Sequence, residues 1–182
     1  MTSADEHGAG AIFVPLDTAA LVGALLGRDL PAAAEHALRM AGLAYLSDAE
    51  AERQLFQARA LAPDHPAVLI GFYRFYFYKN RLEDALVIAR LCLLKAARDN
   101  ALDPDWRHVE PEDADFGSYD SVLPRFYLFT LKAYAYLKLR LGDLDEGRDA
   151  ARKTLALDPT DKVGASVLLD VLARFAAAHD DE

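Results

Sequence analysis

The amino-acid sequence predicts an all-α protein made of repeated helix pairs, and three observations lead to this fold class. The stretch ARALAPD at 58–64 returns as KTLALDP at 153–159, and each copy closes a helical pattern of about thirty residues. Ala and Leu dominate, Gly and Pro number 10 and 8 among 182 residues, and β-branched runs are absent. Apolar residues recur with the helical period between short turns. Such repetition is typical of helical repeat proteins.

The first residues of the chain differ from the rest. Residues 1–10 are small and polar and predict a disordered lead, which leaves 11–182 as a single helical domain. Asp17 or Thr18 is suited to cap a short helix that runs to Leu26. The apolar face of this short helix suggests that it covers the first repeat.

The next elements follow from proline and capping signals. Pro31 is a good first-turn residue for a helix that runs to about Leu46. Ser47 and Glu50 have the spacing of a capping box for a helix that runs to Ala62. The remaining helices are expected at 67–79, 82–99, 123–141, 146–157 and 162–178.

These helix pairs resemble the tetratricopeptide repeat (TPR) family, whose unit is a helix–turn–helix of 34 residues. With Pro63 as a closing proline, three repeats fall near 32–65, 66–99 and 128–161, followed by the capping helix at 162–178. The matching packing positions are Leu38, Ala51, Leu55, Ala58, Leu69, Phe72, Tyr76, Leu82, Ala85, Leu131, Tyr134, Gly142, Leu144, Ala151 and Pro159. The resemblance implies a right-handed superhelix of antiparallel helix pairs with capping helices.

The turns and the departures from the family pattern carry further predictions. Asn80 and Gly142 stand where the turn inside a repeat needs a positive φ. The departures are Leu46 in place of Gly, Gly42 in place of an aromatic residue, Gly147 in place of Ala, and Lys138 in place of an aromatic residue. We therefore expect a distorted first repeat.

An insertion within 97–124 separates the second and third repeats. Its later part, 103–120, has a net charge of −6 from seven acids and Arg107. The acids are Asp103, Asp105, Glu110, Glu112, Asp113, Asp115 and Asp120. With two prolines and a glycine, this stretch predicts a long surface loop, and loops of this length are often functional.

Composition excludes several classes of partner. The formal net charge of −9 disfavours binding to nucleic acid or to an anionic membrane.

The single Cys92 permits no internal disulfide, and no apolar run approaches the roughly 18 residues of a membrane span. Asp5 and Glu6 make the N-terminus a poor signal peptide, so we expect a cytoplasmic protein.

The chain contains no recognisable catalytic or cofactor motif. Glycine-rich phosphate loops, paired cysteines and a Gly-x-Ser-x-Gly motif are all missing, and no enzyme activity is expected. The histidines at 7, 36, 65, 108 and 179 lack ligand spacing, and His108 with its acidic neighbours fits a solvated loop better than a metal site. Cys92 is expected to be a buried packing residue.

The aromatic run 72–78 is apolar on every side, which predicts a helix surrounded by other elements. Most of its rings are expected in the core. In the TPR family one stripe of each first helix lines a concave groove. By the register above, this stripe comprises His36, Met40, Leu43, Ile70, Arg74, Phe77, Tyr78, Phe129, Lys132, Tyr136 and Arg140.

Aromatic rings interleaved with the cations Arg74, Lys132 and Arg140 predict a groove that binds a peptide, with an acidic partner favoured. The alternative is that the insertion, neighbouring helices or a dimer partner bury these rings. The asparagines of the TPR carboxylate clamp are missing, so a chaperone C-terminal peptide is not the implied ligand. We also hypothesise that the acidic stretch 103–120 folds over the groove and competes with the partner.

The expected function is that of an adaptor, scaffold or chaperone. Pro124-Arg125-Phe126 and the stretch 141–144 are similar to the third repeat of type III secretion translocator chaperones. The segments 72–86 and 126–148 resemble TPR proteins encoded beside nitrogen-fixation genes in proteobacteria. The alternative from another class is a self-assembling structural subunit, a homodimer with the aromatic helix buried at its interface.

Overall fold

The computed structural model describes residues 23–24, 29–118 and 120–180. All regular secondary structure in this part of the chain is helical, and it contains no strand. The α-helices are α2 (Ala32–Leu43), α3 (Asp48–Leu61), α4 (Pro66–Tyr78), α5 (Leu82–Asp99), α6 (Val122–Arg140), α7 (Leu144–Leu157) and α8 (Ser166–Asp180). The all-α prediction is confirmed. The predicted lead at 1–10 lies outside the described residues, as does the short helix to Leu26 apart from Gly23 and Ala24, which are helical.

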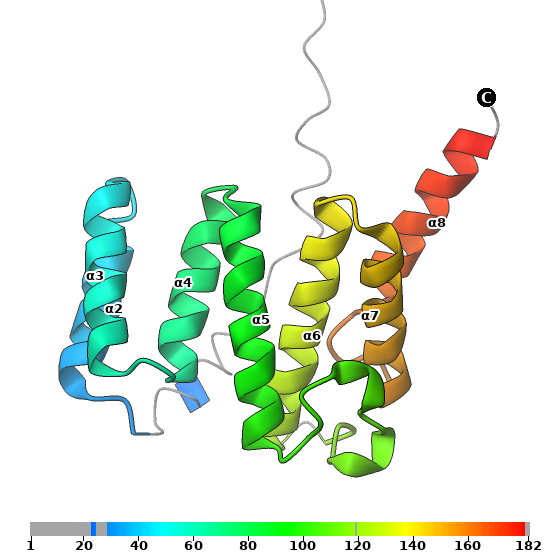
Figure 1. The fold of residues 1–182 in the computed structure, drawn as a ribbon, viewed down its shortest axis with the longest axis horizontal. Coiled ribbons are helices and arrows are strands. Elements are labelled where there is room, and N and C mark those ends of the chain that lie inside the picture. Colours follow the sequence, from blue (N-terminus) through cyan, green and yellow to red (C-terminus); the bar gives the residue numbers. More distant parts are fainter. Residues whose placement is uncertain (1–22, 25–28, 119, 181–182) are drawn as a thin grey trace, which may run out of the picture.

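Consecutive helices form hairpins that stand side by side (Figure 1). The pairs are α2 with α3, α4 with α5, and α6 with α7, and α8 packs against α7. The second and third pairs are joined by extensive packing of α5 on α6. The first pair contacts α4 through both of its helices, but over a smaller surface. This looser junction leaves room for a groove.

Two turns inside the helix pairs close as the sequence predicts. Asn80 has φ of 55° and Gly142 has φ of 88°. In each turn the following amide reaches back into the preceding helix: the N–H groups of Arg81 and Asp143 donate to the carbonyls of Tyr76 and Lys138, both at 2.9 Å. This is the Schellman closure, in which a left-handed residue ends the helix.

Two other helix starts differ from the prediction. Ser47 precedes α3, but its side chain makes no capping hydrogen bond, and the Glu50 carboxylate accepts from Arg53 and Gln54 rather than from the Ser47 amide. The predicted capping box is therefore wrong. The helix expected at 162–178 begins four residues later, at Ser166, whose amide donates to the carboxylate of Asp161 at 3.2 Å.

The aromatic run of α4 lies mainly inside the protein. Phe72 and Tyr73 are 1% and 2% exposed, and Phe75 and Tyr76 are buried as well. Cys92 of α5 is also buried, as predicted. The expectation that most of these rings belong to the core is confirmed, and the rings need no dimer partner to remove them from water.

The acidic insertion is more ordered than a solvated surface loop. It contains two short 3-10 helices, η1 (Trp106–His108) and η2 (Pro111–Asp113), and it buries Trp106, Val109 and Phe116. The prediction of a long surface loop is correct for its charged residues and wrong for these three. The acids dominate the composition, but the apolar residues between them determine where the segment packs.

The insertion packs against α6 and α7 (Figure 1). The rings of Trp106 and Phe116 contact those of Tyr134 and Tyr127 of α6, with centroids 6.4 Å and 5.8 Å apart. The Lys153 ammonium group of α7 donates to the carbonyl of Val109 at 2.9 Å. These contacts place the described part of the insertion on α6 and α7, and the hypothesis that it covers the predicted groove stays a prediction.

Candidate functional site

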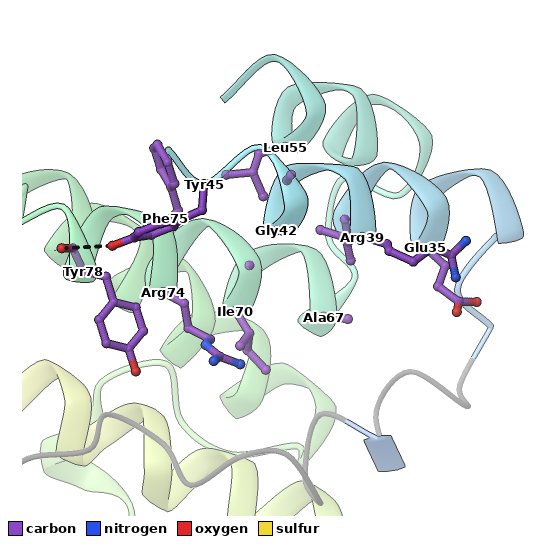
Figure 2. Close-up of a pocket in the computed structure, with 13 residues that line it drawn as sticks. Glu35, Arg39, Gly42, Tyr45, Leu55, Ala67, Ile70, Arg74, Phe75 and Tyr78 are labelled. Carbon is purple, nitrogen blue, oxygen red and sulfur yellow. Dashed lines mark hydrogen bonds between the residues drawn. The ribbon is translucent and has the colours of Figure 1, made fainter. Parts of the chain in front are cut away.

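A groove of about 460 Å³ lies between α2 and α4 (Figure 2). This volume lies in the range typical of ligand pockets. Most of its lining is apolar, and its ends carry charged or aromatic side chains. The groove is lined by Glu35, Leu38, Arg39, Ala41, Gly42, Tyr45, Leu55, Ala67, Ile70, Gly71, Arg74, Phe75 and Tyr78. We call this site the α2/α4 groove.

The floor of the α2/α4 groove depends on a close approach of helices at Gly71. A Cβ atom at this position would lie 3.0 Å from a methyl carbon of Leu38 and 3.3 Å from one of Leu55. Only glycine fits this contact without displacing its neighbours. Gly71 therefore sets the depth of the groove by letting leucines of α2 and α3 rest against α4.

One end of the groove is closed by the turn between α2 and α3. The hydroxyl of Tyr45 donates to the carbonyl of Tyr78 at 3.5 Å. The ammonium group of Lys79 lies 4.1 Å from the centroid of the Tyr45 ring and 2.8 Å from the carboxylate of Asp48. A cation over an aromatic face is attractive, so Lys79 helps to hold the ring in place. Tyr45 thereby becomes a wall of the groove.

The charged side chains of the groove are Glu35, Arg39 and Arg74, all of which are exposed. In the described part of the chain, no hydrogen bond or ion pair engages the side chain of Arg74 or of Glu35. Arg39 contacts the ring of His36 at 3.4 Å. Figure 2 shows Arg74 beside Ile70 and Tyr78 on the same side of α4. This guanidinium group is therefore available to an anionic group of a ligand.

The groove contains part of the stripe that the sequence predicts. Ile70, Arg74 and Tyr78 of α4 line it. On α2, by contrast, the predicted residues do not: Met40 is half-buried outside the groove, exposed His36 contacts Arg39, and Leu43 is 76% exposed at the helix end.

The lining residues of α2 occupy a neighbouring stripe, and this difference has an identifiable source. The groove residues Glu35, Leu38, Arg39 and Gly42 follow helical spacing, about 100° around the helix from the predicted stripe. The prediction counted backwards from Pro63 across the repeat that departs most from the TPR pattern. The sequence signal that was missed is the pair of helical glycines, Gly42 of α2 and Gly71 of α4, which lie on facing helices of the groove.

The predicted residues of α6 lie away from the groove. The ring of Tyr136 contacts that of Phe77, with centroids 5.6 Å apart, and its hydroxyl accepts from Arg140 at 2.7 Å. Phe129 is half-buried. Lys132 donates to the carbonyl of Val163 beside α8, and burial lowers its pKa, although Asp161 opposes this change. None of these four residues, nor Phe77, lines the α2/α4 groove.

The described residues also form a second pocket of about 540 Å³, which is lined by Asp29, residues 62–66, Lys95, Asp99 and Leu123. The described residues contain no group of three or more His, Cys, Asp or Glu side chains that could hold a metal ion. Nor does any helix among them combine the length and apolar character needed to cross a bilayer. We take the α2/α4 groove as the candidate site because its lining includes Ile70, Arg74 and Tyr78 of the predicted stripe.

The fold and the groove place the chain among all-α proteins built from consecutive helix hairpins. The chain belongs to the family of a protein of Azotobacter chroococcum mcd 1 described as "Uncharacterized 19.8 kDa protein in nifW 5'region". The two sequences are 38% identical over 150 residues, which cover 82% of this chain and 84% of that relative. No protein-family model matches the chain, and no solved structure matches it.

Proposed function

We propose that this protein binds a segment of a partner protein in the α2/α4 groove, as an adaptor, scaffold or chaperone without catalytic activity of its own. The observation that carries this proposal is a groove of about 460 Å³ whose apolar floor lies beside the guanidinium group of Arg74, which has no side-chain partner among the described residues. An apolar floor provides affinity, and a charged group at its edge orients the ligand. An acidic partner segment suits this arrangement.

The same proposal includes a TPR-like right-handed superhelix as the architecture. The consecutive helix hairpins support it, as do the turns in which Asn80 and Gly142 have positive φ. In this interpretation the groove lies between the first helices of two successive repeats, where neighbouring repeats commonly present a binding surface.

The proposed setting is the cytoplasm of a nitrogen-fixing cell. The relative in Azotobacter chroococcum takes its description from the nifW 5' region, and this favours an accessory role in nitrogen fixation over that of a type III secretion chaperone. The net charge of −9 supports a protein partner rather than nucleic acid or an anionic membrane.

A self-assembling subunit is the second candidate. Burial of the α4 rings within the chain removes the reason for placing them at a dimer interface. A different observation favours self-association: Leu43 and Leu46, at the tip of the first hairpin, are 76% and 94% exposed. Two strongly exposed leucines three positions apart are suited to contact a second copy of this chain.

Crosslinking in nitrogen-fixing cells tests the binding proposal. The tagged full-length chain is expected to capture a partner, and Arg74→Glu is expected to lose it because the charge at the groove is reversed. Arg98→Glu is the matched control, because Arg98 is an exposed cation of α5 outside the groove. Equal capture by Arg74→Glu and the wild-type chain would contradict the proposal, and capture of a second copy alone would favour self-assembly.

A further inference from the structure

Gly42 is a glycine inside a helix for which neither the backbone nor the packing gives a reason. It lies in the last turn of α2, and its φ is not among the positive values of the described chain. A Cβ atom added to it would meet no described atom within 4 Å. Glycine is disfavoured in helices relative to alanine, so a glycine at this position calls for another explanation.

The contrast with Gly71 separates two roles on the same groove. Gly71 allows close packing, because a Cβ atom there would press on Leu38 at 3.0 Å. Gly42 lines the opposite wall of the groove, on α2 between Arg39 and the turn that carries Tyr45 (Figure 2). A side chain at position 42 would project into open space of the groove rather than into the core.

We propose that Gly42 keeps the α2/α4 groove open for a bulky apolar side chain of a partner segment, whose neighbouring carboxylate pairs with Arg74. This inference rests on the proposed function and adds the chemistry of the ligand. The apolar side chain occupies the space over Gly42, between Leu38 and Tyr45. An aromatic or leucine side chain fits this role, because it removes a large apolar area from water.

Charge complementarity assigns the groove to an acidic partner segment. Arg74 is exposed and has no partner among the described side chains, and a guanidinium group can bind a carboxylate through two parallel hydrogen bonds. Glu35 lies at the start of α2, at the other end of the groove lining from Tyr45. A carboxylate of the ligand is therefore disfavoured beside Glu35 and favoured beside Arg74.

Selection from a random library of 12-residue peptides on the purified full-length chain tests this inference. We expect the enriched peptides to combine a bulky apolar residue with a nearby Asp or Glu. Their affinity, measured by fluorescence anisotropy, is expected to fall about 10-fold or more in Gly42→Leu, because the added side chain fills their site. Gly42→Ala should keep most of the affinity.

The same variants separate a binding role from a structural one. Gly42→Ala and Gly42→Leu should each raise the midpoint of thermal unfolding by about 2–4 °C, since both replace a helical glycine without a clash. Ala60→Leu is the matched control, because it adds the same side chain at an exposed position of α3 outside the groove. It should leave the affinity unchanged.

Four results would overturn the inference. Unchanged affinity in Gly42→Leu, with a loss in Arg74→Glu, would reject the role of Gly42 and leave the groove proposal intact. A lowered unfolding midpoint in Gly42→Ala would show that the glycine is structural. Peptides resembling residues 11–17 of this chain would identify its own segment, rather than a partner, as the occupant. Failure to enrich any peptide on the wild-type chain would count against the proposed function itself.

Discussion

At the scale of single residues, Ala101 has a backbone conformation that glycine or asparagine occupies elsewhere in the chain. Its φ is 56°, close to the 55° of Asn80, and the following amide of Leu102 donates to the carbonyl of Ala97 at 2.9 Å. The end of α5 is therefore a third turn of the Schellman type. An alanine in the left-handed region is strained because its Cβ approaches the following carbonyl.

We predict that Ala101→Gly stabilises the protein by about 1 kcal/mol. Glycine removes the strain of the folded turn, and this gain is larger than the cost of the extra conformational entropy that glycine gives the unfolded chain. Urea unfolding measures the change. Ala60→Gly is the control: Ala60 is exposed within α3, where the same exchange should cost about 1 kcal/mol. If both substitutions destabilise equally, the conformation of Ala101 carries no strain.

Gly147 lies at a close contact between α6 and α7. It stands where the TPR pattern has alanine, and a Cβ there would lie 2.6 Å from the side chain of Leu139 and 2.9 Å from the carbonyl oxygen of Ala135. The departure from the pattern is thus explained by α6, which approaches α7 more closely than alanine would allow.

At the scale of elements, the insertion is a strap fixed to α6 and α7. Trp106 is 6% exposed and contacts Tyr134, and Arg107 forms an ion pair with Glu146 of α7. Lys153 reaches Val109 from the same helix. Because apolar burial stabilises more than exposed ion pairs, Trp106 should hold the strap more firmly than Arg107.

Trp106→Ala is therefore predicted to destabilise the protein by about 3 kcal/mol and to expose 103–120 to proteases. Urea unfolding and limited proteolysis followed by mass spectrometry measure the two effects. Glu112→Gln changes an exposed acid of the same segment and should leave both unchanged. Rapid cleavage of the wild-type strap would contradict the prediction, because an anchored segment resists proteolysis.

The helices could be predicted because their signals are local. Proline, glycine and asparagine act on their immediate neighbours, and the bounds Leu82–Asp99 of α5 agree with the expected 82–99. The capping box at Ser47 failed because Glu50 has a competing partner in Arg53. Local spacing does not reveal such competition between side chains.

The site was predicted less well because it depends on how helices are rotated against one another. On α4 the prediction found Ile70, Arg74 and Tyr78, since this helix matches the repeat pattern closely. On α2 a shift of one residue in register, about 100° around the helix, was enough to select a neighbouring stripe. Long-range packing, such as that of Gly71 against Leu38, sets this rotation.

At the scale of the whole molecule, buried ionisable groups make the free energy of unfolding depend on pH in the alkaline range. Burial raises the pKa of the Cys92 thiol from 9.0 to about 12. Burial and then the hydrogen bond to Glu146 raise the pKa of Tyr134 from 10.0 to about 12. The folded state thus keeps protons that the unfolded chain releases. Lys132 acts in the opposite direction, because its pKa is lowered and the unfolded chain binds its proton more tightly.

We predict that stability is retained up to about pH 9 and is then lost as the pH rises towards 12, because the unfolded state binds fewer protons on the thiol and the phenol throughout this window. Urea unfolding at pH 8, 9, 10 and 11 measures the decline. Cys92→Ala should leave a cavity that lowers stability below about pH 9. It should also make the decline above pH 9 shallower by up to about 1.4 kcal/mol per pH unit, the contribution of one proton. A variant that loses stability as steeply as the wild-type chain would show that Cys92 ionises as readily in the folded protein as in the unfolded one.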